Sequence, residues 1–150
     1  MKIKGNYTFK GPREAVYDLL QDPNALAQAM PGATSLKRVS EDTYQAQVGV
    51  KIGAIKGSYS GSVEVRDARP YEHFRLVVLG QGATGFLKGE GTVDLEETGE
   101  GQTIIHYAGQ TQVGGRIAQV GQRLIQSVAR KMISKGLKSL EKQLAEREEL

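Results

Sequence analysis

The sequence predicts an α+β fold in which a seven-stranded antiparallel sheet wraps around one long C-terminal helix, with two short helices after the first strand. Two observations lead to this prediction. Apolar and polar residues alternate from about residue 34 to residue 113, which is the periodicity of half-buried strands. After Gly114-Gly115 the apolar period becomes 3.6 and stays so, which is typical of an amphipathic helix. A curved sheet wrapped around that helix covers both apolar faces.

The N-terminal third contains one strand and two short helices. Residues 2–10 alternate as a strand, broken by a glycine, and Pro12 then opens a helix because proline suits the first helical position. Asp22 has the character of an N-cap and starts the second helix. Met30-Pro31-Gly32 ends it, since proline cannot continue the hydrogen-bond ladder and glycine accepts the positive φ of a helix end.

Six further strands and the long helix follow. We expect the strands near residues 34–39, 42–50, 55–66, 72–80, 84–96 and 102–113. Turn residues make their connections short, so the strands should form an antiparallel meander. The helix is expected at about residues 115–147, near 45 Å of helix, with Gly121 and Gly136 interrupting its apolar stripe.

Length and composition limit the classes of protein. A chain of 150 residues is expected to form one domain over residues 1–150, large enough to bury a core. The absence of cysteine excludes disulfides, thiolate metal sites and a thiol nucleophile, and suits a reducing cytoplasm. No segment has the apolar length of a signal peptide or a membrane span. The net charge of +3 is mild and gives no indication of nucleic-acid binding.

Glycine alternates with large apolar residues on the expected inner face of the sheet. The odd positions of the strand at 55–66 show this pattern, and the strands at 84–96 and 102–113 repeat it. Missing side chains on a concave face leave volume that is unfavourable when empty, so the pattern predicts a ligand pocket between sheet and helix. The alternative is that these glycines let the strands coil or let the helix approach closely.

The expected ligand-binding residues lie on this inner face, on the facing side of the helix, and at the end of the second short helix. They are Met30, Gly57, Tyr59, Gly61, Val63, Leu76, Leu87, Gly89, Tyr107, Leu124 and Val128. Tyr59 and Tyr107 either donate a hydrogen bond to a ligand or are core residues whose hydroxyls reach the rim. Met30 is either a flexible apolar tip at the entrance or a plug over the core.

Side chains that carry catalysis are absent from the expected inner face. His73 and His106 have no partner at metal-ligand spacing, so no metal site is predicted. The serines of the strand at 55–66 face outward without a neighbouring base. Residues 80–85 lack the Lys-Ser/Thr pair and the helix of a phosphate-binding loop. We therefore expect no catalytic residue.

The first two thirds of the long helix carry basic side chains and no acidic one before Glu141. They are Arg116, Arg123, Arg130, Lys131, Lys135 and Lys138. The pattern is typical of a solvated helix surface. It also suits a docking surface for an acidic protein or for anionic lipid headgroups, for which Arg116, Arg123, Arg130 and Lys131 are the expected contact residues.

Three runs of sequence resemble the family of the G-type subunit of carbon monoxide dehydrogenase, within the START and Bet v 1-like (SRPBCC) superfamily. They are PREAVYDLLQDPNALAQAMPGATSL, VGVKIGAIKGSYSGSVEV and VGGRIAQVGQRLIQSVARKM. The resemblance extends over about residues 2–145 and implies a helix-grip domain with a hydrophobic cavity.

The resemblance also implies a function. It is that of a non-catalytic accessory protein which binds a quinone or isoprenoid-like molecule and assists a molybdenum-type carbon monoxide dehydrogenase, or a related hydroxylase, in membrane attachment or electron transfer to quinone. A bound quinone or lipid would then be the one cofactor, and the protein would lie in the cytoplasm, at the inner face of the membrane.

Two other hypotheses stay open. One is an enzyme similar to the cyclases and dehydratases that act on polyketide-like substrates, which requires an acid or base pointing inward. The other is a protein-docking module without a ligand, in which the glycines serve packing alone.

Overall fold

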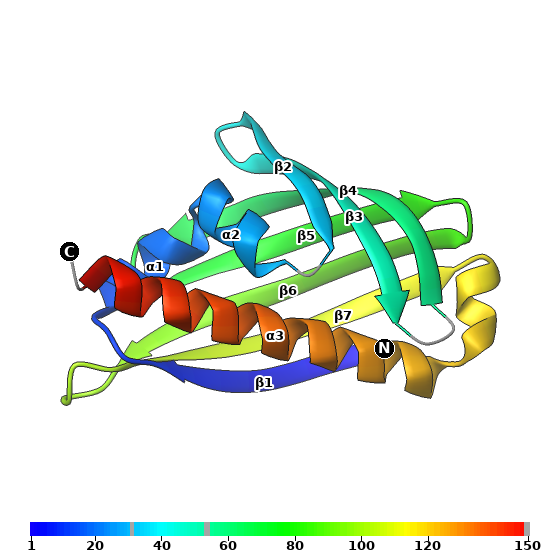
Figure 1. Ribbon diagram of the computed structural model, residues 1–150. Helices are drawn as coiled ribbons and strands as arrows, with labels where there is room; N and C mark the ends of the chain where they lie inside the picture. Colours follow the sequence, from blue (N-terminus) through cyan, green and yellow to red (C-terminus); the bar gives the residue numbers. More distant parts are fainter. Residues whose placement is uncertain (31, 53–54, 149–150) are drawn as a thin grey trace.

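The computed structural model describes residues 1–30, 32–52 and 55–148 (Figure 1). Its elements are β1 (Lys2–Phe9), α1 (Arg13–Leu20), α2 (Pro23–Ala29), β2 (Ala33–Ser40), β3 (Thr43–Ile52), β4 (Ile55–Arg69), β5 (His73–Gly82), β6 (Gly85–Glu97), β7 (Thr103–Gly114), the 3-10 helix η1 (Arg116–Val120) and α3 (Gln122–Glu148). The predicted α+β fold is confirmed, with its two short helices after the first strand and its long C-terminal helix.

The seven strands form one antiparallel sheet in the order β1-β7-β6-β5-β4-β3-β2. Strands β2 to β7 are the predicted meander, and β1 joins the sheet by pairing with β7. Figure 1 shows α3 lying across the curved sheet, with α1 and α2 beside its C-terminal half. The sheet and α3 therefore face each other along most of the length of the molecule.

The prediction that the long helix begins near residue 115 is wrong. Residues 116–120 form η1, and Gly121 follows with a φ of +99°, which a continuous α-helix does not allow. The α-helix begins at Gln122. The apolar period passes through the break because side chains three residues apart also share a side in a 3-10 helix.

The short helix α2 begins as predicted. The Asp22 carboxylate accepts a hydrogen bond from the Asn24 amide at 2.9 Å, which makes Asp22 the N-cap. Met30 is the C-cap, and Pro31 lies outside the described residues. Gly32 has a φ of +80° and accepts a hydrogen bond from the Gly49 amide at 2.8 Å. A Cβ at Gly32 would overlap the Gly49 carbonyl, so this turn requires glycine.

The N-terminal end of the fold differs in two details from the prediction. Pro12 is the N-cap of α1 and not its first helical residue. Strand β1 is continuous through Gly5, because the Tyr107 ring from β7 covers the space that a side chain would fill there.

The core lies at one end of the molecule, where α1, α2 and the C-terminal half of α3 meet the sheet. Its largest fully buried side chains include Phe9, Leu19 and Leu144. Thr103 is also buried, and its hydroxyl donates a hydrogen bond to the Gly11 carbonyl at 2.8 Å. The opposite end, near η1, is packed less completely.

Candidate ligand-binding groove

The inner face of the sheet changes from buried to half-buried along the strands. The residues at the α1 end are at most 9 % exposed, and they are Phe74, Val93, Leu95 and Ile105. Toward η1, the inner apolar residues Leu76, Val78 and Leu87 of β5 and β6 are half-buried. The apolar surface of the sheet is therefore incompletely covered near η1.

The helix that faces the sheet shows the same gradient. Leu140 and Leu144 are 4 % and 2 % exposed, whereas Leu124, near the start of α3, is 38 % exposed. Val128, one turn further on, is 8 % exposed. We define the inner groove as the inner positions of β4–β7 near η1 together with the N-terminal half of α3. It is the part of the expected pocket that the structure leaves partly open.

Most of the predicted ligand residues border the inner groove. By register, Val63 lies opposite Val78, Leu76 opposite Gly91, and Gly89 opposite Val78. Leu124 and Val128 lie on the facing helix. Two predicted residues lie apart from this set: Gly57 is exposed at the start of β4, and Met30 is half-buried where α2 leads into β2.

The two predicted tyrosines fill space above glycines of the neighbouring strands. The Tyr59 ring lies over Gly82, where a Cβ would come within 2.7 Å of it, and the Tyr107 ring lies over Gly5. The Tyr59 hydroxyl shares a hydrogen bond of 2.6 Å with the Thr84 hydroxyl in the β5–β6 turn. These glycines therefore accommodate aromatic rings and do not leave empty volume.

Other inner glycines allow close backbone approach. A Cβ at Gly61 or Gly109 would lie 2.9 Å from a carbonyl oxygen of the next strand, and one at Gly91 would lie 3.0 Å from one. Gly61 pairs with Gly80, and Gly91 pairs with Gly109. Paired glycines let the sheet coil strongly, which supports the alternative explanation of the pattern at these positions.

The inner groove is not the only concave feature. A hollow of about 1200 Å³ lies at the β5–β6 turn, and its side chains come mostly from the outer positions of β3–β6. Of the predicted ligand residues, Gly61 and Leu87 line it. A strongly twisted sheet is saddle-shaped, so its outer face is also concave along one diagonal.

One carboxylate meets an inner-face residue, and the sequence pattern did not single it out for this role. The Tyr7 hydroxyl donates a hydrogen bond to Oε2 of Glu141 on α3. Burial raises the pKa of Tyr7 to about 12, and the hydrogen bond to Glu141 adds to the rise. The pair lies at the packed end, beside a hollow of about 430 Å³ lined by three lysines. The position of Glu141 between Leu137 and Leu144 on the apolar stripe was the available signal.

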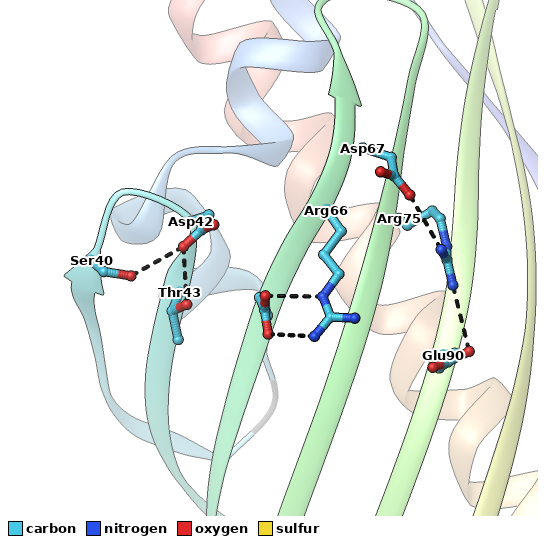
Figure 2. A network of polar contacts seen from close by, with 8 residues as sticks. Ser40, Asp42, Thr43, Arg66, Asp67, Arg75 and Glu90 are labelled. Carbon is cyan, nitrogen blue, oxygen red and sulfur yellow. Dashed lines mark hydrogen bonds and ion pairs between the residues drawn. The ribbon is translucent and has the colours of Figure 1, made fainter.

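Ion pairs occupy the outer face of β4–β6 away from the β5–β6 turn. Figure 2 shows Arg66 on Glu64 at 2.9 Å, and Arg75 between Asp67 and Glu90 at 3.2 Å and 3.6 Å. His73 Nδ1 lies 2.7 Å from the Asp94 carboxylate on the same face. Within the described part of the chain, no three His, Cys, Asp or Glu side chains come together as metal ligands.

The basic side chains of η1 and α3 are exposed, as their pattern predicts. All six of them have exposed side chains: Arg116, Arg123, Arg130, Lys131, Lys135 and Lys138. We call the five on α3 the basic face. No helix in the described residues is long and apolar enough to cross a membrane.

A seven-stranded sheet around a long helix, with an apolar groove between them, defines a START-like domain of the SRPBCC superfamily. Residues 5–145 match the family of the G-type subunit of carbon monoxide dehydrogenase (CoxG). The chain therefore belongs to the CoxG family, as the three sequence runs indicated. No curated protein matches it in sequence.

Solved structures agree with this assignment. A conserved protein from Geobacillus kaustophilus is 36% identical with a TM-score of 0.94, over 97% of this chain and 96% of that one. A START superfamily protein from Mycobacterium smegmatis is 13% identical with a TM-score of 0.75, over 97% of both chains. The Zhui aromatase/cyclase from Streptomyces sp. R1128 is 11% identical with a TM-score of 0.70, over 98% of this chain and 94% of that one. The last two likenesses show the fold alone.

Proposed function

We propose that this CoxG-family protein is a non-catalytic accessory protein that binds a hydrophobic, quinone or isoprenoid-like molecule in the inner groove. The observation that carries the proposal is the change from buried to half-buried apolar side chains toward η1. Apolar surface that the chain leaves partly uncovered on a concave face gains free energy when a ligand covers it, at about 25 cal/mol per Å².

The chemistry of the groove supports an apolar ligand with a weakly polar head. Its walls are aliphatic at Val63, Leu76 and Leu87, and hydroxyl groups are its polar atoms, at Tyr59 and Tyr107. A hydroxyl donates a hydrogen bond to a carbonyl, such as those of a quinone, without the desolvation penalty of a charge. Among the described inner positions around the groove there is no acidic, basic or imidazole side chain. This supports binding and gives little support to the cyclase or dehydratase hypothesis.

The family suggests what such binding serves. We propose that the protein assists a carbon monoxide dehydrogenase-type enzyme, by carrying a quinone to it or by holding it near the inner face of the membrane. Arg116 and the basic face, with Arg123, Arg130 and Lys131, would contact the anionic partner or surface. The exposure of all six cations beside the open end of the groove supports this arrangement.

The test is binding of menaquinone-4 to the purified chain, measured by native mass spectrometry. We expect a one-to-one complex. Leu124→Lys, which places a charge at the groove, should weaken binding by at least about tenfold, whereas Val39→Lys, at a comparably exposed apolar residue on β2, should not. No complex with the wild-type chain, or equal affinity of both variants, would reject the inner groove as the site.

A further inference from the structure

The proposed function leaves the hollow on the outer face of β3–β6 unused. Two rows of side chains cross it from strand to strand. By register, the row nearer the β5–β6 turn is Gln47, Ser60, Gln81 and Phe86, and the other row is Gln45, Ser62, Leu79 and Lys88. Directly paired side chains on one face lie about 5 Å apart, so each row is a continuous surface.

The lining of this hollow is unlike the rest of the outer face. Amide and hydroxyl side chains predominate, and no carboxylate lies among the described residues that line it. Lys88 and Arg116 are the two cations there. The ion pairs of Figure 2 occupy the other part of this face, beyond Ser62 and Lys88. The hollow is therefore polar and weakly positive.

Phe86 provides a flat apolar surface inside the hollow. Its ring lies on the backbone of Gly114, the residue with which it pairs on β7, because a Cβ at Gly114 would overlap the ring. The side chain is nevertheless 41 % exposed. One face of the ring is therefore packed on the sheet, while much of the rest is open to a stacking partner.

Both cations lie close to this ring. Lys88 Nζ is 5.9 Å from the centre of the Phe86 ring. Arg116 begins η1, which the β5–β6 turn holds in place, since the Ile117 amide donates a hydrogen bond to the Thr84 carbonyl at 2.8 Å. Gly115 also packs against Gly85, where a Cβ would lie 2.6 Å from the Gly85 Cα. The ring, Lys88 and Arg116 thus belong to one corner of the hollow.

We propose that the outer hollow binds a mononucleotide. The base would stack on Phe86, the amide of Gln81 beside the ring would pair with the donor and acceptor edge of the base, and the phosphate would contact Lys88 and Arg116. The serine hydroxyls of the two rows lie next to this position and suit the ribose. Side chains hold the phosphate here, which agrees with the absence of a phosphate-binding loop at residues 80–85.

This proposal is independent of the inner groove, because the two sites lie on opposite faces of the sheet. The test is titration of the full chain with AMP, followed by calorimetry and by amide chemical shifts. Saturable binding is expected, with the largest shifts at residues 79–88 and 114–117. Adenosine and inorganic phosphate, tested separately, should each bind at least about tenfold more weakly than AMP, since each supplies only part of the contact.

Variants decide whether the proposed corner is the site. Phe86→Ala and Arg116→Gln should each weaken AMP binding by at least about tenfold. The matched control is Arg66→Gln, an exposed cation on the outer face of β4 outside the hollow, which should leave the affinity unchanged. Phe86→Leu keeps the apolar volume but not the stacking surface and should also weaken binding. No saturable binding at millimolar AMP, binding as tight to phosphate alone, or an affinity unaffected at Phe86 would overturn the proposal.

Discussion

Single residues at the packed end connect the outermost strand of the sheet to the long helix. The Tyr7 hydroxyl on β1 donates a hydrogen bond to the Glu141 carboxylate on α3, across more than 130 residues of sequence. The neutral phenol is the donor in this contact. Its ionisation would place two negative charges side by side, which is why the pKa of Tyr7 rises.

This contact predicts a dependence of stability on alkaline pH. The Tyr7 pKa is about 12 in the folded chain against an ordinary value of 10.0, so the unfolded chain loses this proton first. Between these pH values the unfolded chain binds fewer protons, and the free energy of unfolding therefore falls as pH rises. In denaturant titrations, wild type should lose more stability from pH 10 to pH 12 than Tyr7→Phe does. Parallel curves for the two proteins would contradict the assigned hydrogen bond.

The glycines show where residue type alone was ambiguous. Their alternation correctly located the inner face of the sheet, but not what fills the space beside each glycine. At Gly5 and Gly82 the filler is a tyrosine ring, and at Gly61 and Gly91 it is the backbone of the next strand. Sequence gives only the missing Cβ. The neighbour that approaches is set by strand register and by the coil of the sheet.

At the scale of elements, α3 has two halves with different tasks. The C-terminal half packs on α1, α2 and β1, whereas the N-terminal half borders the inner groove. The apolar stripe is continuous in sequence along both halves. Their difference arises because α1 and α2 add a third layer at one end only.

This difference predicts unequal effects of one substitution at two positions. Leu144→Ala removes a side chain that is 2 % exposed and should lower the free energy of unfolding by about 2–5 kcal/mol. Leu124→Ala removes one that is 38 % exposed and should lower it by less than about 1 kcal/mol. Urea denaturation measures both. Similar losses would mean that the start of α3 is packed as tightly as its end.

At the scale of the whole molecule, charge is distributed unevenly. The basic face of α3 carries five exposed cations, while the outer sheet face pairs its cations with carboxylates. The unpaired cations create a local positive potential that the mild net charge of +3 conceals.

This asymmetry predicts binding to an anionic surface that depends on the basic face. Sedimentation with vesicles should show binding to mixed phosphatidylglycerol and phosphatidylcholine, none to phosphatidylcholine alone, and loss of binding at high salt. The double variant Arg123→Glu with Arg130→Glu should lose at least about tenfold in affinity. The double variant Lys51→Glu with Lys56→Glu changes the net charge equally on β3 and β4 and is the control. Equal behaviour of the two double variants would leave the basic face as an ordinary solvated surface.

The sequence by itself determined the fold class, the order of the elements, the inner and outer parity of each strand, and membership of the CoxG family. These follow from periodicity and from local signals such as the Asp22 N-cap, which depend only on neighbouring residues. The tertiary structure alone decided where the core closes, which glycines receive an aromatic ring, and that the outer face is hollow beside Phe86. Those features depend on how a coiled sheet brings distant strands together, and no local stretch of sequence contains that information.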